Sequence, residues 1–140
     1  MPTRSMAAEI ESVKAAYAAL NRNDVPAFVA LLDARIERIE PADTPEAGTF
    51  RGLEAVRAHI AKARDTWAEG GCTPETLTVL GDRVVAYVQV RVRLKHETEW
   101  REGRTTDVFT FRNGKVTQFR TFFDDKQAKD WLDAGSPVKS

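Results

Sequence analysis

The chain has 140 residues, of which 42% are hydrophobic and 30% are charged, a composition typical of one globular domain with a buried core. Lysine plus arginine and aspartate plus glutamate both total 21, so the formal net charge is zero. This balance argues against a nucleic-acid or membrane partner that is recognised mainly by charge. The single cysteine, Cys72, excludes an intrachain disulfide.

The sequence contains no segment typical of a membrane span or a signal peptide. Its longest apolar runs, such as residues 27–32, fall far short of the roughly 18 residues that a membrane span needs. The N-terminal residues lack the apolar core of a signal peptide. We therefore expect a cytoplasmic protein with one domain over residues 6–133 and flexible termini at 1–5 and 134–140.

Helical periodicity dominates the first third of the chain. One apolar stripe predicts a first helix that ends near residues 21–24: Ile10, Val13, Tyr17 and Leu20. Asp24 can cap a short second helix over residues 25–32, with Pro26 tolerated in its first turn. Residues 35–40 then predict a short strand.

A turn-rich stretch at residues 41–52 precedes a third expected helix. Its apolar stripe is formed by Leu53, Val56, Ile60, Ala63 and Trp67. The pair Gly70-Gly71 is expected to end this helix.

From Thr73 the hydrophobic period changes to two, which predicts strands. We expect four of them, at 76–80, 83–100, 104–111 and 116–123, separated by turns at 81–82, 101–103 and 113–114. A closing helical segment is expected at 124–132. This order predicts an α+β domain whose helices cover one face of a long curved antiparallel sheet, leaving an apolar concave mouth for a small molecule.

One carboxyl group shares a strand face with two phenylalanines. Side chains alternate along a strand, so Asp107, Phe109 and Phe111 point the same way. A carboxyl group in an apolar pocket loses solvation, which raises its pKa. Such an acid can donate a hydrogen bond to an oxyanion while a second carboxylate acts as a base.

Three strings resemble the nuclear-transport-factor-2-like superfamily, and within it the ketosteroid isomerases and SnoaL-like polyketide cyclases. They are "AALNRNDVPAFVALL", "IEP…GTFRGLEAVRAHI" and "TTDVFTFRNGKVTQFRTFF", and the resemblance runs from about Ile10 to Phe123. It implies a single SnoaL-like domain. The expected fold is a cone-shaped, curved, mostly antiparallel sheet with three main helices on its concave side.

The resemblance also implies two catalytic residues. Glu40 lies nineteen residues after Asn21 and directly before Pro41, where the isomerases carry a carboxylate that moves a proton on carbon beside a ketone. Asp107 occupies the position of the aspartic acid that stays protonated and donates a hydrogen bond to the developing enolate.

Two departures from the isomerase pattern argue against steroid isomerisation itself. The isomerase tyrosine that shares the oxyanion hole aligns with Ala16, and the neighbouring Tyr17 lies about 100° around the helix. Glu40 in place of aspartate adds one methylene, and a misplacement of about 1 Å is costly in catalysis.

Further residues are expected to line the pocket and bind substrate: Tyr17, His59, Trp67, Tyr87, Arg91, Phe109, Phe119, Thr121 and Phe123. Each has a structural alternative. Asp107 is either a pocket acid or a buried acid paired with Arg91 or Arg120. Glu40 is either a base or a solvated strand end. His59 is either a neutral base or a satisfied core histidine.

The strand at 83–94 has two possible orientations. Its valine face resembles a core face, yet alignment with the isomerase pattern turns Tyr87, Gln89 and Arg91 inward. The valines would then form an apolar outer sheet face, which a homodimer would cover.

The expected function is a small enzyme that transfers a proton on a hydrophobic, carbonyl-bearing small molecule. No organic cofactor or metal is expected, because the two histidines have no nearby second ligand. One alternative is a non-catalytic ligand-binding or dimerisation module of the same fold. Another is water activation by Asp107 and an arginine, similar to the limonene epoxide hydrolases of this superfamily.

Overall fold

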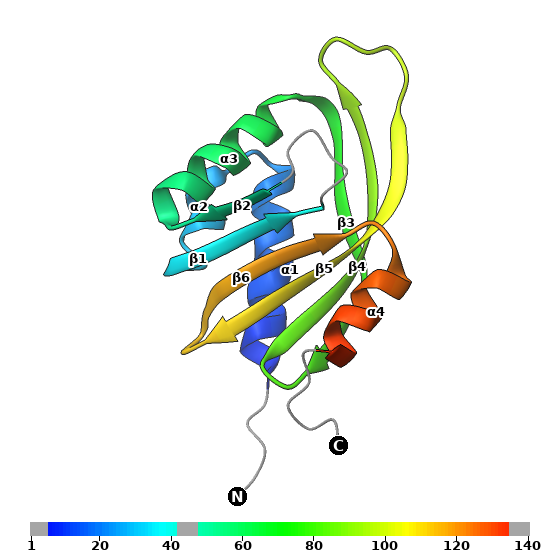
Figure 1. Ribbon diagram of the computed structural model, residues 1–140. Helices are drawn as coiled ribbons and strands as arrows, with labels where there is room; N and C mark the ends of the chain where they lie inside the picture. The colour runs from blue at the N-terminus through cyan, green and yellow to red at the C-terminus, as the bar shows by residue number, and fades with distance from the viewer. Residues whose placement is uncertain (1–5, 42–47, 135–140) are drawn as a thin grey trace, which may run out of the picture.

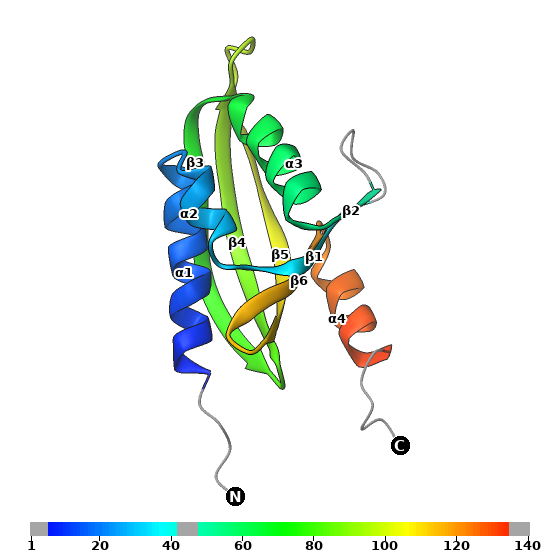
Figure 2. The ribbon, with the colours of Figure 1, turned by 90° about the vertical axis from the view of Figure 1, so that its left-hand side faces the viewer.

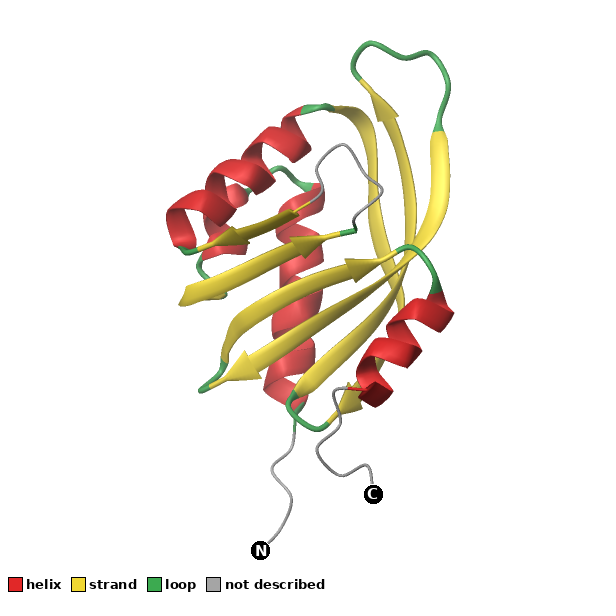
Figure 3. Ribbon diagram, viewed as in Figure 1, coloured by secondary structure: helices red, strands yellow, loops and turns green. Residues whose placement is uncertain are grey.

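The computed structural model describes residues 6–41 and 48–134, so the predictions for both termini fall largely outside the described residues. The elements follow in chain order: α1 (Ala7–Asn21), α2 (Val25–Val29), β1 (Leu32–Glu40), β2 (Gly48–Arg51), α3 (Leu53–Asp65), β3 (Trp67–Leu80), β4 (Arg83–Leu94), β5 (Arg101–Arg112), β6 (Lys115–Phe122) and α4 (Asp125–Ala134). The predicted α+β class is confirmed (Figure 3). Within the described ranges, no helix is both long and apolar enough to cross a membrane.

The six strands form one curved, open sheet in the order β2-β1-β6-β5-β4-β3 (Figure 1). All neighbouring pairs are antiparallel except β1 and β6, which run parallel. Helices α1, α2 and α3 lie on the concave side, whereas α4 lies on the convex side (Figure 2). The expected curved sheet with three main helices on its concave side is therefore confirmed.

The hydrophobic core lies between α1–α3 and the concave face of the sheet. Its most deeply buried side chains come from every layer: Val13, Phe28, Ile36, Val56, Val84, Val88 and Phe109. Asp107 and Phe111 flank Phe109 on this same face of β5 and are also buried, as strand alternation predicts. The strand thus carries its carboxyl group into the core layer.

The hairpin turns are partly as predicted. Asn113 and Gly114 have φ values of 52° and 80°, which suits the two-residue turn between β5 and β6. The prediction of a turn at 101–103 is wrong, because these residues pair with β4 and the turn lies at 95–100. Strands β4 and β5 consequently extend into a long hairpin that projects beyond α3 (Figure 1).

The prediction that the glycine pair at 70–71 ends the third helix is wrong, because both glycines lie within β3. Helix α3 stops at Asp65, and β3 begins at Trp67. Gly70 has a φ of 104° and pairs with Val92 of β4, just after a bulge between Trp67 and Glu69. A Cβ on Gly70 would lie 2.1 Å from the Arg91 carbonyl oxygen. Close backbone approach, not helix termination, therefore requires this glycine.

Residues 48–51 form strand β2, which the prediction of a turn-rich stretch missed. Gly48 to Arg51 pair with the end of β1, and Arg51 contacts Glu37 across the ladder at 2.9 Å. Residues 42–47 lie outside the described part of the chain. This short edge strand brings Phe50 against α3.

The orientation of β4 that turned Tyr87 and Arg91 inward is wrong. Val84, Val88 and Val92 are buried on the core side, whereas Tyr87 is 38% exposed. Arg91 stacks on Trp100 and pairs with Glu102 on the convex side. The apolar outer face that was the reason to expect a homodimer is absent from β4.

Helix α4 covers part of the convex face itself. Trp131 packs against Phe122 and lies near the guanidinium groups of Arg83 and Arg120, 4.8 Å and 4.6 Å from its ring centroid. Val85, which points to this side, is 1% exposed. The homodimer therefore stays a prediction, but the apolar outer face of β4 no longer supports it.

Replacing Gly70 by alanine should lower the free energy of unfolding by about 2 kcal/mol or more, because the new Cβ clashes with the β4 backbone at a strained φ. Gly103→Ala is the matched control, since a Cβ at Gly103 meets nothing within 4 Å. Urea unfolding of both variants checks this. Equal effects of the two substitutions would contradict the close-approach explanation.

Candidate active site

A cavity of about 210 Å³ opens on the concave side of the sheet. Its polar residues come from both helices and strands: Tyr17, Arg38, Glu40, His59, Arg64, Thr105, Asp107 and Thr121. Its apolar walls include Phe28, Ile60, Trp67 and Phe119. Elements distant in sequence therefore converge on one mixed polar and apolar site.

Asp107 accepts two hydrogen bonds inside this cavity. The Tyr17 hydroxyl lies 2.5 Å from Oδ2, and the Thr121 hydroxyl donates to Oδ1 at 2.7 Å. Burial raises the pKa of Asp107, while the positive charge of Arg38 and the two hydroxyl donors oppose that rise. The predicted alternative of a buried pair with Arg91 or Arg120 is wrong, because both arginines lie on the convex side.

The Tyr17 hydroxyl is present at the site, contrary to the alignment, which placed it to one side. Tyr17 is 3% exposed and meets Phe109 edge-on, with centroids 5.8 Å apart. Burial and the adjacent Asp107 raise the pKa of Tyr17 well above its usual value, so the phenol keeps its proton. Packing of α1 on β5, rather than alignment register, decides where this hydroxyl points.

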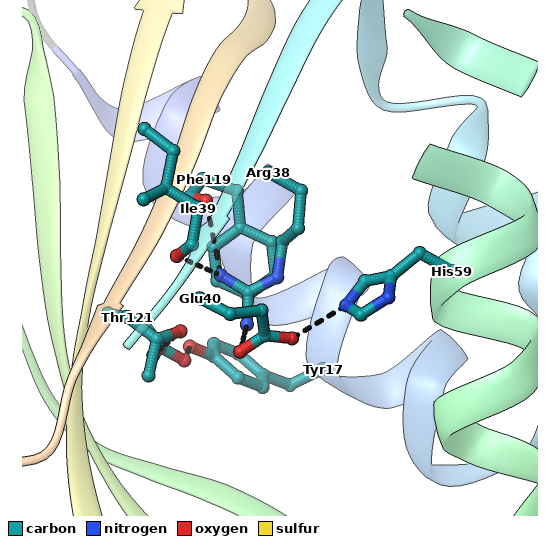
Figure 4. Close-up of polar contacts among 8 residues, drawn as sticks. Tyr17, Arg38, Ile39, Glu40, His59, Phe119 and Thr121 are labelled. Carbon is teal, nitrogen blue, oxygen red and sulfur yellow. Dashed lines mark hydrogen bonds and ion pairs between the residues drawn. The ribbon is translucent and has the colours of Figure 1, made fainter. Parts of the chain in front are cut away.

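Glu40 contacts a cation and an imidazole, one on each oxygen (Figure 4). Arg38 Nη2 lies 2.9 Å from Oε1, and His59 Nε2 lies 2.8 Å from Oε2. The Glu40 side chain is only 15% exposed, so the alternative of a solvated strand end is wrong.

Arg38 is the buried residue that the sequence reasoning missed. Its guanidinium stacks 3.8 Å from the Phe119 ring centroid, and Nη1 donates to the carbonyl oxygens of Phe119 and Ile39 at 3.1 Å and 3.2 Å. The period of two in β1 places Arg38 on the same face as Ile36 and Glu40. That spacing was the signal that could have identified it.

His59 is buried and has a partner on each side. Its imidazole contacts Glu40 and stacks on Phe50 of β2, with ring centroids 3.8 Å apart and planes 16° from parallel. Helical spacing places it beside Val56 and Ile60 on the inner face of α3. His59 therefore lines the cavity and also occupies a satisfied core position, whereas its role as a base stays a prediction.

The remaining predicted pocket residues divide into three groups. Trp67, Phe119, Thr121 and Phe123 line the cavity, with Phe123 52% exposed. Phe109 lies behind Tyr17 and stacks on Phe119 at 4.5 Å, so it supports the wall without lining it. Tyr87 and Arg91 are remote, as described above.

Two other cavity residues, Arg64 and Cys72, were also missed. Burial raises the pKa of the Cys72 thiol to about 12, which leaves it uncharged. No three His, Cys, Asp or Glu side chains within residues 6–41 and 48–134 form a group that could hold a metal ion.

Comparison with known protein families places the chain. A model of the SnoaL-like domain matches residues 13–119. The chain belongs to the SnoaL-like domain family. No curated protein matches the sequence.

Solved structures share the fold of this SnoaL-like domain. A nuclear-transport-factor-2-like protein from Burkholderia xenovorans LB400 is 27% identical with a TM-score of 0.71, covering 91% of this chain and 98% of its own. A protein from Jannaschia sp. CCS1 described as a SnoaL-like polyketide cyclase is 16% identical with a TM-score of 0.74, covering 97% and 100%. TerC, co-crystallised with polyporic acid, is 20% identical with a TM-score of 0.74, covering 89% and 97%.

The stability of this SnoaL-like domain should depend on the charge of Asp107. Burial raises the pKa of Asp107 in the folded state. The contribution of the protonated acid to stability is therefore fully present below the unfolded-state pKa of about 3.9, and it is lost as pH rises through the folded-state pKa. Asp107→Asn should therefore gain stability relative to wild type as pH rises above about 4. Urea unfolding of both proteins from pH 4 to 8 checks this. A constant difference across that range would contradict a raised pKa.

Breaking the buried ion pair should be costly. Arg38→Met should destabilise the domain by about 3 kcal/mol, because it leaves the Glu40 carboxylate without its cation. The double variant with Glu40→Leu should recover most of that loss, since neither charge remains. A double-mutant cycle in urea checks this, and additive effects of the two substitutions would contradict the pairing.

Proposed function

We propose that this SnoaL-like domain is a cofactor-independent acid–base enzyme. It moves a proton on a carbon beside a carbonyl group in a hydrophobic small molecule. The observation that carries the proposal is the contrast between two carboxyl groups in one cavity. Asp107 lies among hydroxyl groups and aromatic rings, whereas Glu40 contacts a guanidinium and an imidazole.

Glu40 is the proposed general base. Its carboxylate takes a proton from the substrate carbon, and the electron pair of the C–H bond moves into a carbon–carbon double bond. The contacts from Arg38 and His59 hold the carboxylate in position beside the apolar wall of the cavity. The protonated Glu40 then returns the proton to the same carbon or to another one, which regenerates the carboxylate.

Asp107 and Tyr17 are the proposed hydrogen-bond donors to the carbonyl oxygen. Negative charge develops on that oxygen as the carbon loses its proton, and donors fixed in a dry site stabilise it strongly. The raised pKa values of both groups favour their protonated forms. Thr121 holds the other carboxyl oxygen of Asp107, so the acid keeps its orientation when Tyr17 turns to a ligand.

The size of the cavity favours a small substrate. Its 210 Å³ lies below the roughly 300–1,000 Å³ of pockets for drug-sized ligands, so a ligand of one or two rings suits it. TerC, which shares the fold, was crystallised with polyporic acid, and this supports a small-molecule ligand.

Deuterium exchange tests the proposal without knowledge of the substrate. In D₂O, wild type should accelerate exchange of the acidic C–H bonds of 2-tetralone, a two-ring ketone, measured by proton NMR. Glu40→Gln and Asp107→Asn should each lower the catalysed rate by about 10²-fold or more, because each removes one acid–base partner. Glu37→Gln is the matched control: Glu37 is on β1 outside the cavity and contacts Arg51.

Three outcomes would contradict this function. Exchange no faster than with buffer alone, across a panel of one- and two-ring ketones, would favour a binding module. Exchange that survives in Glu40→Gln would exclude Glu40 as the base. Equal losses in Glu37→Gln would show that the effect is not specific to the cavity.

A second function, water activation, is favoured by one specific observation. Arg38 pairs with Glu40, and its charge also opposes the rise that burial causes in the pKa of Asp107, so one arginine acts on both acids. In that mechanism the Glu40 carboxylate takes a proton from water, the resulting hydroxide attacks an epoxide carbon, and Asp107 gives its proton to the released oxygen. Incorporation of ¹⁸O from labelled water into the diol formed from cyclohexene oxide distinguishes this reaction from proton transfer on carbon.

A further inference from the structure

The cavity contains a second arginine whose charge no carboxylate balances. Arg64, on the last turn of α3, lines the cavity together with Trp67. Its Nε donates to the Leu20 carbonyl oxygen at 2.7 Å, and its Nη2 donates to the Asn21 carbonyl oxygen at 3.0 Å. Among the residues that the structure describes, no carboxylate forms an ion pair with it.

Arg64 differs in this respect from the other cavity arginine. Arg38 is paired with Glu40, and its Nη1 donates to two backbone carbonyl oxygens. Cys72 is an uncharged thiol. With Asp107 protonated, as the proposed function requires, the fixed charges of the cavity are two arginines and one glutamate. The cavity then carries one excess positive charge, contributed by Arg64.

The Arg64 guanidinium also has unused donors and a fixed position. A guanidinium carries five N–H groups, and the two carbonyl oxygens of α1 occupy two of them. Its Cζ lies 4.7 Å from the Trp67 ring centroid, so packing limits its motion. The carbonyl groups only anchor it, which leaves its planar edge available for an anion.

The α1 residues that anchor Arg64 lie about one helical turn from Tyr17. Leu20 and Asn21 follow Tyr17 by three and four residues, which corresponds to roughly 4.5–6 Å along a helix axis. Cys72 lines the same cavity, and the Asn21 side-chain amide donates to its carbonyl oxygen at 2.8 Å. A ligand of one or two rings can therefore contact both Arg64 and Tyr17.

We propose that Arg64 binds a carboxylate on the substrate, which is therefore a hydrophobic carbonyl compound that is also an acid. The carbonyl part of this inference and the count of cavity charges rest on the proposed function, whereas the anion site itself rests on the unpaired, anchored guanidinium of Arg64. A planar guanidinium can donate two parallel hydrogen bonds to a carboxylate, and Trp67 supplies an apolar surface for the adjoining ring. Arg64 thus acts as the specificity-determining residue of the cavity.

Binding of a matched pair of probes tests the proposal by calorimetry. The probes are 2-naphthoate and 2-naphthaldehyde, which share a ring system and a carbonyl group but differ in charge. Wild type should bind 2-naphthoate at least tenfold more tightly than 2-naphthaldehyde. Arg64→Gln should weaken 2-naphthoate binding by roughly ten- to hundredfold, as expected for charged hydrogen bonds, and leave 2-naphthaldehyde unchanged.

Two further variants separate charge from anchoring. Arg64→Lys should retain only part of the preference for 2-naphthoate, because it keeps the positive charge but loses the planar pair of donors. Arg57→Gln is the matched control: Arg57 is on the same helix and pairs with Glu54. It should change neither affinity. Thermal unfolding identifies any variant that has lost the fold, and the glutamine amide can still donate to one α1 carbonyl.

The proposal is overturned if wild type shows no preference for 2-naphthoate. It is also overturned if Arg64→Gln weakens both probes equally, which is the result expected of a purely structural arginine. These readouts need no catalysis, so they are independent of the deuterium-exchange assay. Arg64-dependent anion binding without deuterium exchange would reject the proposed enzyme and support the anion site. Deuterium exchange without Arg64-dependent anion binding would support the enzyme and reject the anion site.

Discussion

The cavity depends on how the fold compensates the loss of water around Asp107. A carboxyl group on the core face of β5 loses its hydration, and an unsatisfied group there would cost several kcal/mol. Tyr17 from α1 and Thr121 from β6 supply the missing hydrogen bonds at 2.5 Å and 2.7 Å. This carboxyl therefore links one helix and two strands, and the same contacts that satisfy it also fix the position of the Tyr17 hydroxyl.

Different contacts compensate the loss of water around the second carboxyl group, Glu40. Glu40 lies at the end of β1, next to the parallel strand β6, where Arg38 and His59 are also buried. The parallel pairing brings Arg38 opposite Phe119, so the guanidinium stacks on that ring while it contacts Glu40. Hydroxyl groups contact one acid, and a guanidinium and an imidazole contact the other, because Asp107 enters the cavity from β5 and Glu40 from β1.

Much of the fold was predictable because local patterns decide it. The periods of 3.6 and 2 identify α1, α3 and the strands of the meander, and Asn113-Gly114 identifies its last turn. The failures occur where a distant segment decides the local structure. Gly70 follows a helical stripe, yet the backbone of β4 requires it inside a strand. Strand β2 forms only because β1 offers it a partner.

The two acids and His59 of the site were predictable, whereas its two arginines were not. Asp107 and Glu40 follow from the resemblance and from strand alternation. Arg38 was overlooked although its spacing from Glu40 is two, because one sequence does not show which face of an edge-proximal strand is buried. Arg64 has no comparable signal, since lysine and arginine in the last turn of a helix are common on solvated faces.

The polar content of the cavity argues for a role beyond holding the fold together. Buried ion pairs seldom stabilise a protein more than apolar residues of the same size, and a buried acid destabilises it once ionised. Asp107, Glu40 and the four polar side chains that contact them lie in a space lined by phenylalanines and a tryptophan. A domain that served only as a scaffold would gain stability by replacing them. Retaining them is reasonable where the same groups must bind, orient and exchange protons with a ligand.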